Sequence, residues 1–207
     1  MNFQANNLDA AYSQVKELNT LATTTGVNLV ESLTSNIKSL KSHWKGSDAT
    51  LHINNLINVR EALVAIVSDV SAVAHNVSMP IVQAQTIRNS NGGGGEVGEI
   101  ISLYNGVLEK IETLSDTTEY FVDPVNAPLD HQQLSSICDQ FNSFYTSFQS
   151  IKEDLMNNWI SGSDRGQAVS DFEQFEANAT TMAFTSNKPP MIINIFICIN
   201  PSQPLLP

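Results

Sequence analysis

Apolar side chains recur every three, four or seven residues along most of the chain, which is the spacing of one face of an α-helix. The first stripe, over residues 8–44, predicts one long helix that continues through Gly26, because a single glycine costs only about 1 kcal/mol relative to alanine. The second stripe, over residues 53–81, is rich in β-branched residues but far too long for a strand, so it also predicts a helix. Pro80 should end or kink this helix near Ser78.

The second half of the chain continues the helical pattern after a glycine-rich break. Asn-Gly-Gly-Gly-Gly at residues 91–95 predicts a flexible linker. A third helix is expected over residues 97–121, from a stripe made of Val97, Ile100, Tyr104, Val107, Ile111, Leu114 and Phe121. It should stop at Asp123-Pro124, and Pro128 should keep the connection irregular. A fourth helix should open at Asp130, with Gln133 completing a capping box, and a shorter fifth helix is expected over residues 165–182.

These breaks divide the sequence into four parts: a helical hairpin over residues 1–90, a linker over 91–98, a second helical module over 99–186 and a proline-rich apolar tail over 187–207. The predicted fold class is all-α, with long antiparallel helical hairpins packed as a four-helix-bundle-like or coiled-coil assembly. Residues 5–44 and 47–78 should pair antiparallel, and residues 130–159 should join the same bundle. The tail leaves three alternatives open: it folds back on the bundle, binds a partner, or is foreign to the natural protein.

The two tryptophans lie in a repeated motif. In both copies a leucine lies four residues before the tryptophan, and Gly-Ser-Asp follows it. A glycine with positive φ ends a helix, and Ser or Asp caps the next one, so both copies predict a helix reversal; at the second copy Asp164 and Gln167 fit a capping box. The candidate residues of the turn are Trp44, Gly46, Trp159 and Gly162. Each tryptophan is expected in the last turn of a helix, and a structure in which Trp44 and Trp159 lie within strands would contradict the predicted architecture.

Trp44-Lys45-Gly46, midway between two long amphipathic segments, resembles the Trp-X-Gly (ESAT-like) family of small type VII secretion proteins. The resemblance covers residues 1–90 and implies a helical hairpin of the kind that dimerises into a four-helix bundle. The second copy departs from the family pattern, because residues 159–162 contain one extra residue and the following helix is short. The chain therefore resembles a diverged tandem version of the family.

The resemblance implies a non-enzymatic bacterial protein that acts by helix–helix binding, either as a type VII secretion substrate or as a targeting partner or chaperone. Its partner would be another Trp-X-Gly protein, an effector or the secretion ATPase, and self-association is possible. The implied location is the cytoplasm and then the medium, without a cleaved signal peptide. However, the family's export signal, Tyr-X-X-X-Asp/Glu, is formed by none of Tyr12, Tyr104, Tyr120 and Tyr145. The alternative function is an intracellular or surface coiled-coil scaffold unrelated to secretion.

Composition and the residues that could carry chemistry exclude further classes of function. The net charge of −11 argues against nucleic acids and anionic membranes as partners. No signal-peptide pattern opens the chain, and the longest apolar run, residues 191–199, is about half of what a membrane span needs. His43, His52 and Asp48 could meet at the first turn, but solvated polar side chains explain them better than a metal site does. Cys138 and Cys198 form no disulfide framework, and we expect no catalytic residue, no metal and no cofactor.

The glycine-rich linker bears on oligomeric state. A second module tethered to the first has a high effective concentration, so it should compete well with a separate subunit. We therefore expect a mostly intramolecular bundle with Trp44 and Trp159 each near a turn. The short fifth helix should leave an apolar patch, which is a candidate site for a partner or a second copy.

Overall fold

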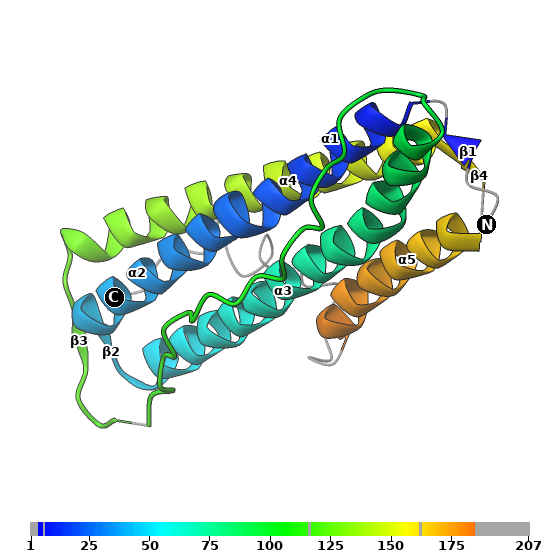
Figure 1. Ribbon diagram of the computed structural model, residues 1–207. Coiled ribbons are helices and arrows are strands. Elements are labelled where there is room, and N and C mark those ends of the chain that lie inside the picture. The colour runs from blue at the N-terminus through cyan, green and yellow to red at the C-terminus, as the bar shows by residue number, and fades with distance from the viewer. Residues whose placement is uncertain (1–3, 6, 116, 162, 185–207) are drawn as a thin grey trace. The chain divides into compact units, whose positions relative to one another are not determined.

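The computed structural model describes residues 4–5, 7–115, 117–161 and 163–184, and most of this part of the chain is helical (Figure 1). The helices are α1 (Leu8–Thr20), the π-helix η1 (Leu21–Gly26), α2 (Val27–His43), α3 (Ser47–Ser90), α4 (Asn126–Asn158) and α5 (Ser163–Phe184). The strands are β1 (Gln4–Ala5), β2 (Trp44–Lys45), β3 (Phe121–Val122) and β4 (Trp159–Ser161). The predicted all-α class is confirmed at this level. None of the helices described is long and apolar enough to cross a membrane.

The first long helix is continuous through Gly26, as predicted, but it contains a π-helical stretch that the sequence pattern did not indicate. Gly26 is buried at the end of this stretch. A Cβ atom placed there would lie 2.7 Å from Val67 Cγ2 and 3.2 Å from Phe144 Cε2. Glycine is therefore required at this point by close packing rather than by a break in the helix.

Of the two outcomes expected at Pro80, an end or a kink of the helix, the end is wrong. Pro80 lies inside α3, which continues to Ser90, and both Val77 and Ile81 beside it are buried. Packing on both sides of the proline offsets the single main-chain hydrogen bond that it removes.

The start of α4 also differs from the prediction. The helix begins at Asn126, so Asp130 is not its cap and Pro128 lies in the first turn, where a missing N–H costs nothing. Asp123 supplies the cap: its Oδ1 accepts hydrogen bonds from the main-chain N–H groups of Val125 (2.9 Å) and Asn126 (3.0 Å). These donors, with the Asn126 side-chain amide, lower the pKa of Asp123 to about 2.

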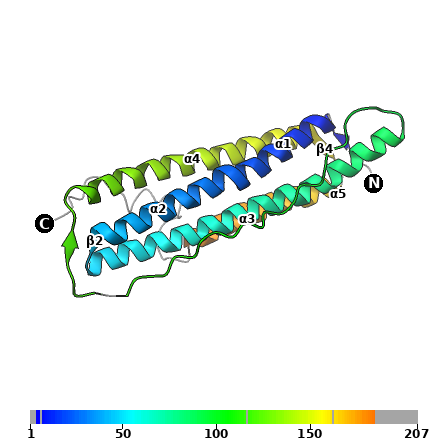
Figure 2. The same cartoon turned by 60° about the vertical axis from the view of Figure 1, so that its left-hand side comes forward.

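The third predicted helix, residues 97–121, is wrong. Residues 95–115, called the strap from here on, are extended and run along α3 without helical turns (Figure 2). Side chains of α3 replace the intrahelical hydrogen bonds that a helix would have made: Ser78 Oγ accepts from Ile101 N–H (3.0 Å), and Ser71 Oγ accepts from Tyr104 N–H (2.8 Å). Because these main-chain N–H groups already have hydrogen-bond partners, the segment does not have to form a helix to satisfy them.

The chain divides into two compact units, each made of three separate segments. The first comprises Met1–Val27, Ala65–Val107 and Ser143–Glu176; the second comprises Asn28–Val64, Leu108–Asn142 and Ala177–Pro207. In the first unit the ring of Phe148 lies 4.4 Å from that of Phe175, and both are buried. In the second, Leu33, Ile37 and Ile53 are buried. Each unit draws on both sides of residues 91–98, so the compact units do not coincide with the predicted modules 1–90 and 99–186.

Candidate interaction sites

The two tryptophan motifs form turns with the same order of elements. At each turn a helix ends at the residue before the tryptophan, a short strand begins with the tryptophan, and a new helix begins at Ser47 or Ser163. The expectation that each tryptophan lies in the last helical turn is therefore wrong, since both lie in strands. The condition set against the predicted bundle is thereby met, although the described chain is mostly helical. At both sites the chain leaves one long helix and enters the next within a few residues. Gly46 has the expected positive φ of 130°, whereas Gly162 and the side chain of Asp164 lie outside the described residues.

Strand pairing explains why the tryptophans leave the helices. β2 pairs antiparallel with β3, which places Trp44 opposite Val122; β4 pairs antiparallel with β1, which places Trp159 opposite Ala5. β1 and β3 are the strands that precede the long helices of the first and second halves. Each tryptophan strand is thus paired with the strand that opens the long helix of the other half.

An N-terminal cap residue follows each of the two opening strands, β1 and β3. These cap residues were the feature of the sequence from which the two strands could have been located. Asn7 Oδ1 accepts hydrogen bonds from the N–H groups of Asp9 (3.1 Å) and Ala10 (3.0 Å), just as Asp123 does at α4. An Asn or Asp in an extended conformation before a helix is a standard N-terminal cap. A strand of two residues is too short to show a hydrophobic periodicity. Only the cap residue that follows each strand could therefore have indicated its position in the sequence.

The first turn is partly open to solvent. Trp44 is half-buried and stacks on the ring of His52, with centroids 5.5 Å apart and an interplanar angle of 27°. A Cβ atom at Gly46 would lie 3.2 Å from Tyr120 Cδ2. Both φ and the short approach therefore require glycine at this position.

Replacing Gly46 by alanine should lower the free energy of unfolding by about 1–3 kcal/mol, because the side chain meets Tyr120 and strains a left-handed main chain. Gly166 in α5 is the matched control, since a Cβ there meets nothing within 4 Å. Gly166→Ala should be neutral or stabilising by up to about 1 kcal/mol, as expected for a helical position. Urea unfolding of both variants measures the difference, and equal effects would contradict the assignment of Gly46.

The second turn is closed. Trp159 is completely buried, and its main-chain oxygen accepts a hydrogen bond from Arg165 Nε at 2.6 Å. The two copies therefore share the order of their elements but differ in the burial of the tryptophan. Only Trp44 is accessible enough to contribute to a surface.

Asp130 ties α2 to α4 within the second unit. Its side chain is almost fully buried, at 7 % exposure. Its carboxylate accepts a hydrogen bond from Ser39 Oγ (2.6 Å) and contacts His43 Nδ1 (2.7 Å), while its main-chain oxygen accepts one from Asn36 Nδ2 (2.8 Å). A nucleophilic triad needs the imidazole between hydroxyl and carboxylate. Here Ser39 Oγ donates directly to Asp130 and lies 3.3 Å from His43 Nδ1, the same ring nitrogen that contacts Asp130, so the imidazole does not lie between the two groups.

The other residues considered for chemistry are also held in structural contacts. His52 stacks on Trp44, and within the part of the chain that the structure describes no group of three or more His, Cys, Asp or Glu side chains is arranged to hold a metal. Cys138 is buried, and burial raises the pKa of its thiol to about 11, which keeps it protonated at neutral pH. Cys198 lies outside the described residues.

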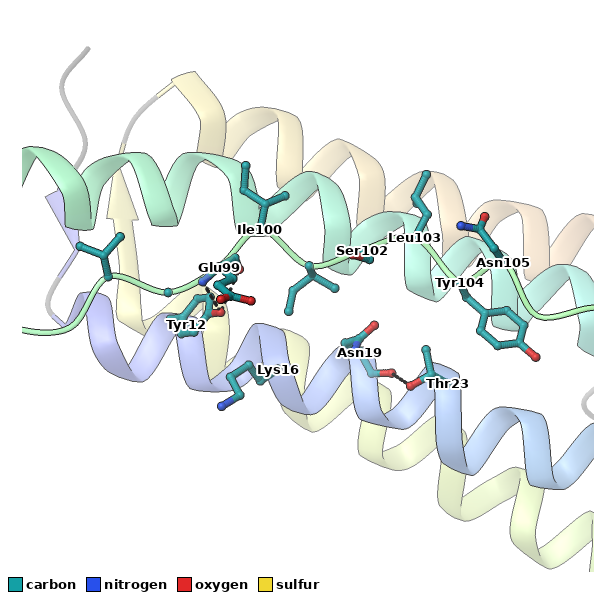
Figure 3. A pocket seen from close by; sticks show the side chains of 13 residues that line it. Tyr12, Lys16, Asn19, Thr23, Glu99, Ile100, Ser102, Leu103, Tyr104 and Asn105 are labelled. Atoms are coloured by element: carbon teal, nitrogen blue, oxygen red, sulfur yellow. Dashed lines mark hydrogen bonds between the residues drawn. The ribbon is translucent and has the colours of Figure 1, made fainter.

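The strap and α1 enclose a groove in the first unit (Figure 3). Its volume is about 670 Å³, and it is lined by α1 on one side and by residues 97–105 on the other. The helical side chains are Tyr12, Lys16 and Asn19 of α1 and Thr23 of η1. Tyr12 Oη bonds to both the N–H and the oxygen of Glu99, each at 2.8 Å, and so holds the strap at one end of the groove.

Sequence reasoning missed the polar residues of α3 that hold the strap. Arg60, placed in the apolar stripe from the sequence, is 2 % exposed, donates from Nε to Thr34 Oγ1 (2.9 Å) and contacts the main-chain oxygen of Glu109. Ser71, Ser78 and Gln85 are equally buried and follow Arg60 at intervals of eleven, seven and seven residues. Their helical spacing within an apolar stripe was the feature of the sequence that could have identified them as buried polar residues.

Comparisons with known proteins identified no relative of this chain. No protein-family model matches the chain, and no curated protein or solved structure matches it. Its function therefore has to be inferred from its own residues and contacts.

Proposed function

We propose that this chain is a non-enzymatic bacterial protein of a type VII secretion system, which binds helical partners either as a substrate or as a targeting partner for a larger effector. The observation that supports this most is the duplicated tryptophan turn. Both copies combine a helix end, a tryptophan strand and a new helix that begins at the serine of Gly-Ser-Asp. One Trp-X-Gly tripeptide is a weak motif, but a second, diverged copy with the same order of elements is much less expected by chance.

The pairing of strands supports a tandem architecture. In this proposal α1 to α3 form one helical hairpin, α4 and α5 form a second, and the two pack as a four-helix-bundle-like assembly within a single chain. Each half contributes its opening strand to the tryptophan strand of the other half, which is the exchange expected of two related hairpins facing each other. A separate subunit is then unnecessary, because the tether raises the effective concentration of the second hairpin.

Secretion is tested by following the tagged full chain in the producing bacterium, with and without the ATPase of the secretion system. We expect the protein in the medium only when the ATPase is intact, with a cytoplasmic enzyme as the control for lysis. None of the four tyrosines has an acidic residue four positions later, so export should also require a partner that carries the signal. Equal amounts in the medium of both strains, or none in either, would contradict this role.

The missing tyrosine signal favours a second candidate, a helical scaffold or adaptor unrelated to secretion. It would use the same helix faces to bind a partner inside the cell or on its surface. The same secretion experiment separates the two candidates, because the scaffold's distribution should not depend on the ATPase.

A further inference from the structure

Residues 97–107 of the strap expose four apolar side chains. Val97 is 43 % exposed, Ile100 51 %, Leu103 46 % and Val107 97 %. Figure 3 shows Ile100 and Leu103 pointing away from α1. Single exposed apolar residues are common, but four within eleven residues form a potential contact surface.

The helices hold this part of the strap by its main chain. The N–H groups of Gly98, Ile101 and Tyr104 donate to Gln85 Oε1 (2.9 Å), Ser78 Oγ (3.0 Å) and Ser71 Oγ (2.8 Å). His75 Nδ1 donates to the main-chain oxygen of Ile101 at 2.6 Å. These contacts do not depend on the apolar side chains of the strap.

The surface beneath the strap is polar where the strap is anchored. Ser71, Ser78 and Gln85 are each at most 1 % exposed, and their polar atoms would be hydrated if the strap moved away. Water can replace the lost hydrogen-bond partners of polar groups, which lowers the free-energy cost of their exposure. Newly exposed apolar groups gain no such replacement. The glycine loop before the strap, with positive φ at Gly92, Gly94 and Gly95, supplies a main chain with few steric restrictions.

The same residues have the pattern of an amphipathic helix. At about 100° per residue, all six apolar residues between 97 and 107 fall within an arc of about 160°. These residues are Val97, Ile100, Ile101, Leu103, Tyr104 and Val107. Glu99 lies outside the arc, and Glu96 and Glu99 would both be near the helix N-terminus, where negative charge is favourable.

We propose that residues 97–107 are a docking segment that leaves α1 and α3, folds as an amphipathic helix and binds an apolar groove between two helices of a partner protein. Glu96 and Glu99, on a chain with net charge −11, favour a groove with a basic rim. Residues 108–115 stay in place, since Arg60 contacts the oxygen of Glu109 and Asn54 bonds to both main-chain groups of Leu114. The inference rests on the helix-binding part of the proposed function and is independent of secretion.

Release of the strap is tested in the full chain with the double variant Ser71→Ala/Ser78→Ala. The control is Thr86→Ala/Ser90→Ala, whose hydroxyls bond only to main-chain oxygens of α3 itself. In the release variant we expect amide exchange in residues 97–107 to become at least about tenfold faster, Cα chemical shifts there to move to helical values, and Nile red binding to rise several-fold. The control should match the wild type.

A second pair of substitutions tests the apolar face. Adding Ile100→Ser/Val107→Ser to the release variant should return Nile red binding to the wild-type level while exchange stays fast. Cα shifts that remain extended or become those of a random coil would overturn the proposal. So would dye binding that is unaffected by Ile100→Ser/Val107→Ser.

The partner is tested with a photo-crosslinking amino acid at position 103 of the full chain in the producing bacterium. Position 51 on α3 is the control, because Leu51 is 61 % exposed and Leu103 46 %. We expect a crosslinked helical protein from position 103 only, lost in Ile100→Ser/Val107→Ser, and helical Cα shifts for residues 97–107 in the purified complex. Equal products from both positions, or an extended segment in the complex, would overturn the proposal. If these results hold while secretion fails, only the secretion role is lost.

Discussion

Replacing Trp159 by alanine should lower the free energy of unfolding by about 3–5 kcal/mol, the largest effect expected at either turn. The side chain is completely buried, so its removal leaves a cavity lined by groups that cannot fully relax. Urea unfolding followed by circular dichroism measures the loss, and Trp159→Phe, which keeps an aromatic ring, should recover part of it. The result tests whether the second copy of the motif is structural despite its departure from Trp-X-Gly.

Trp44→Ala is the matched control. Trp44 is half-buried, so its loss should cost about 1 kcal/mol, mainly from the lost contact with His52. This variant also leaves Trp159 as the only tryptophan, and its emission should be blue-shifted in the native state and shift to the red on unfolding. Similar losses of stability at the two tryptophans, or solvent-exposed emission from Trp159, would contradict the difference in burial.

Replacing Arg60 by alanine should cost about 2–4 kcal/mol, because it removes a buried side chain and leaves polar groups without their donor. The guanidinium is 2 % exposed and bonds to Thr34 Oγ1, Glu61 Oε1 and the main-chain oxygen of Glu109. Arg60→Lys should recover only part of the stability, since an ammonium group cannot reproduce the planar fork. Amide exchange in residues 108–115 should accelerate in Arg60→Ala.

Lys38→Ala is the control for Arg60, because both side chains bond to Glu109. Lys38 Nζ lies 2.6 Å from Glu109 Oε2, but the two side chains are 52 % and 60 % exposed. Solvent screening makes such a pair nearly neutral for stability, so Lys38→Ala should leave unfolding almost unchanged. If Lys38→Ala were as damaging as Arg60→Ala, burial would not be the cause of the Arg60 effect.

The long helices could be predicted because their signal is local and repeated many times. Residues 8–43 are helical without interruption, α4 covers the predicted fourth helix up to Asn158, and α5 includes the predicted fifth. The positive φ at Gly46 was also predictable, since few residues other than glycine adopt a φ of 130°. Helix boundaries were less predictable. α3 continues past Pro80 because the residues on both sides of the proline are packed in the core, and α4 begins earlier than expected because Asp123 caps it.

The interaction sites were predicted only in part. The repeated motif identified Trp44 and Trp159 as equivalent residues, but the sequence around them gave no measure of their different burial. The strand pairs could not be predicted, because strands of two or three residues show no hydrophobic periodicity and pair with partners more than seventy residues away along the chain. Asp130 was assigned to a cap, whereas its carboxylate is bound by Ser39 and His43 of α2.

The helical class, the continuous first helix and the duplicated turn were determined by local sequence, because periodicity and glycine conformation act within a few residues. The conformation of residues 95–115 was decided only by tertiary structure. Helix propensities differ by less than about 1 kcal/mol per residue, so they yield to hydrogen bonds supplied by another segment. Ser71, Ser78 and Gln85 of α3 supply those bonds to the strap, and no pattern within residues 97–107 reveals that they are there.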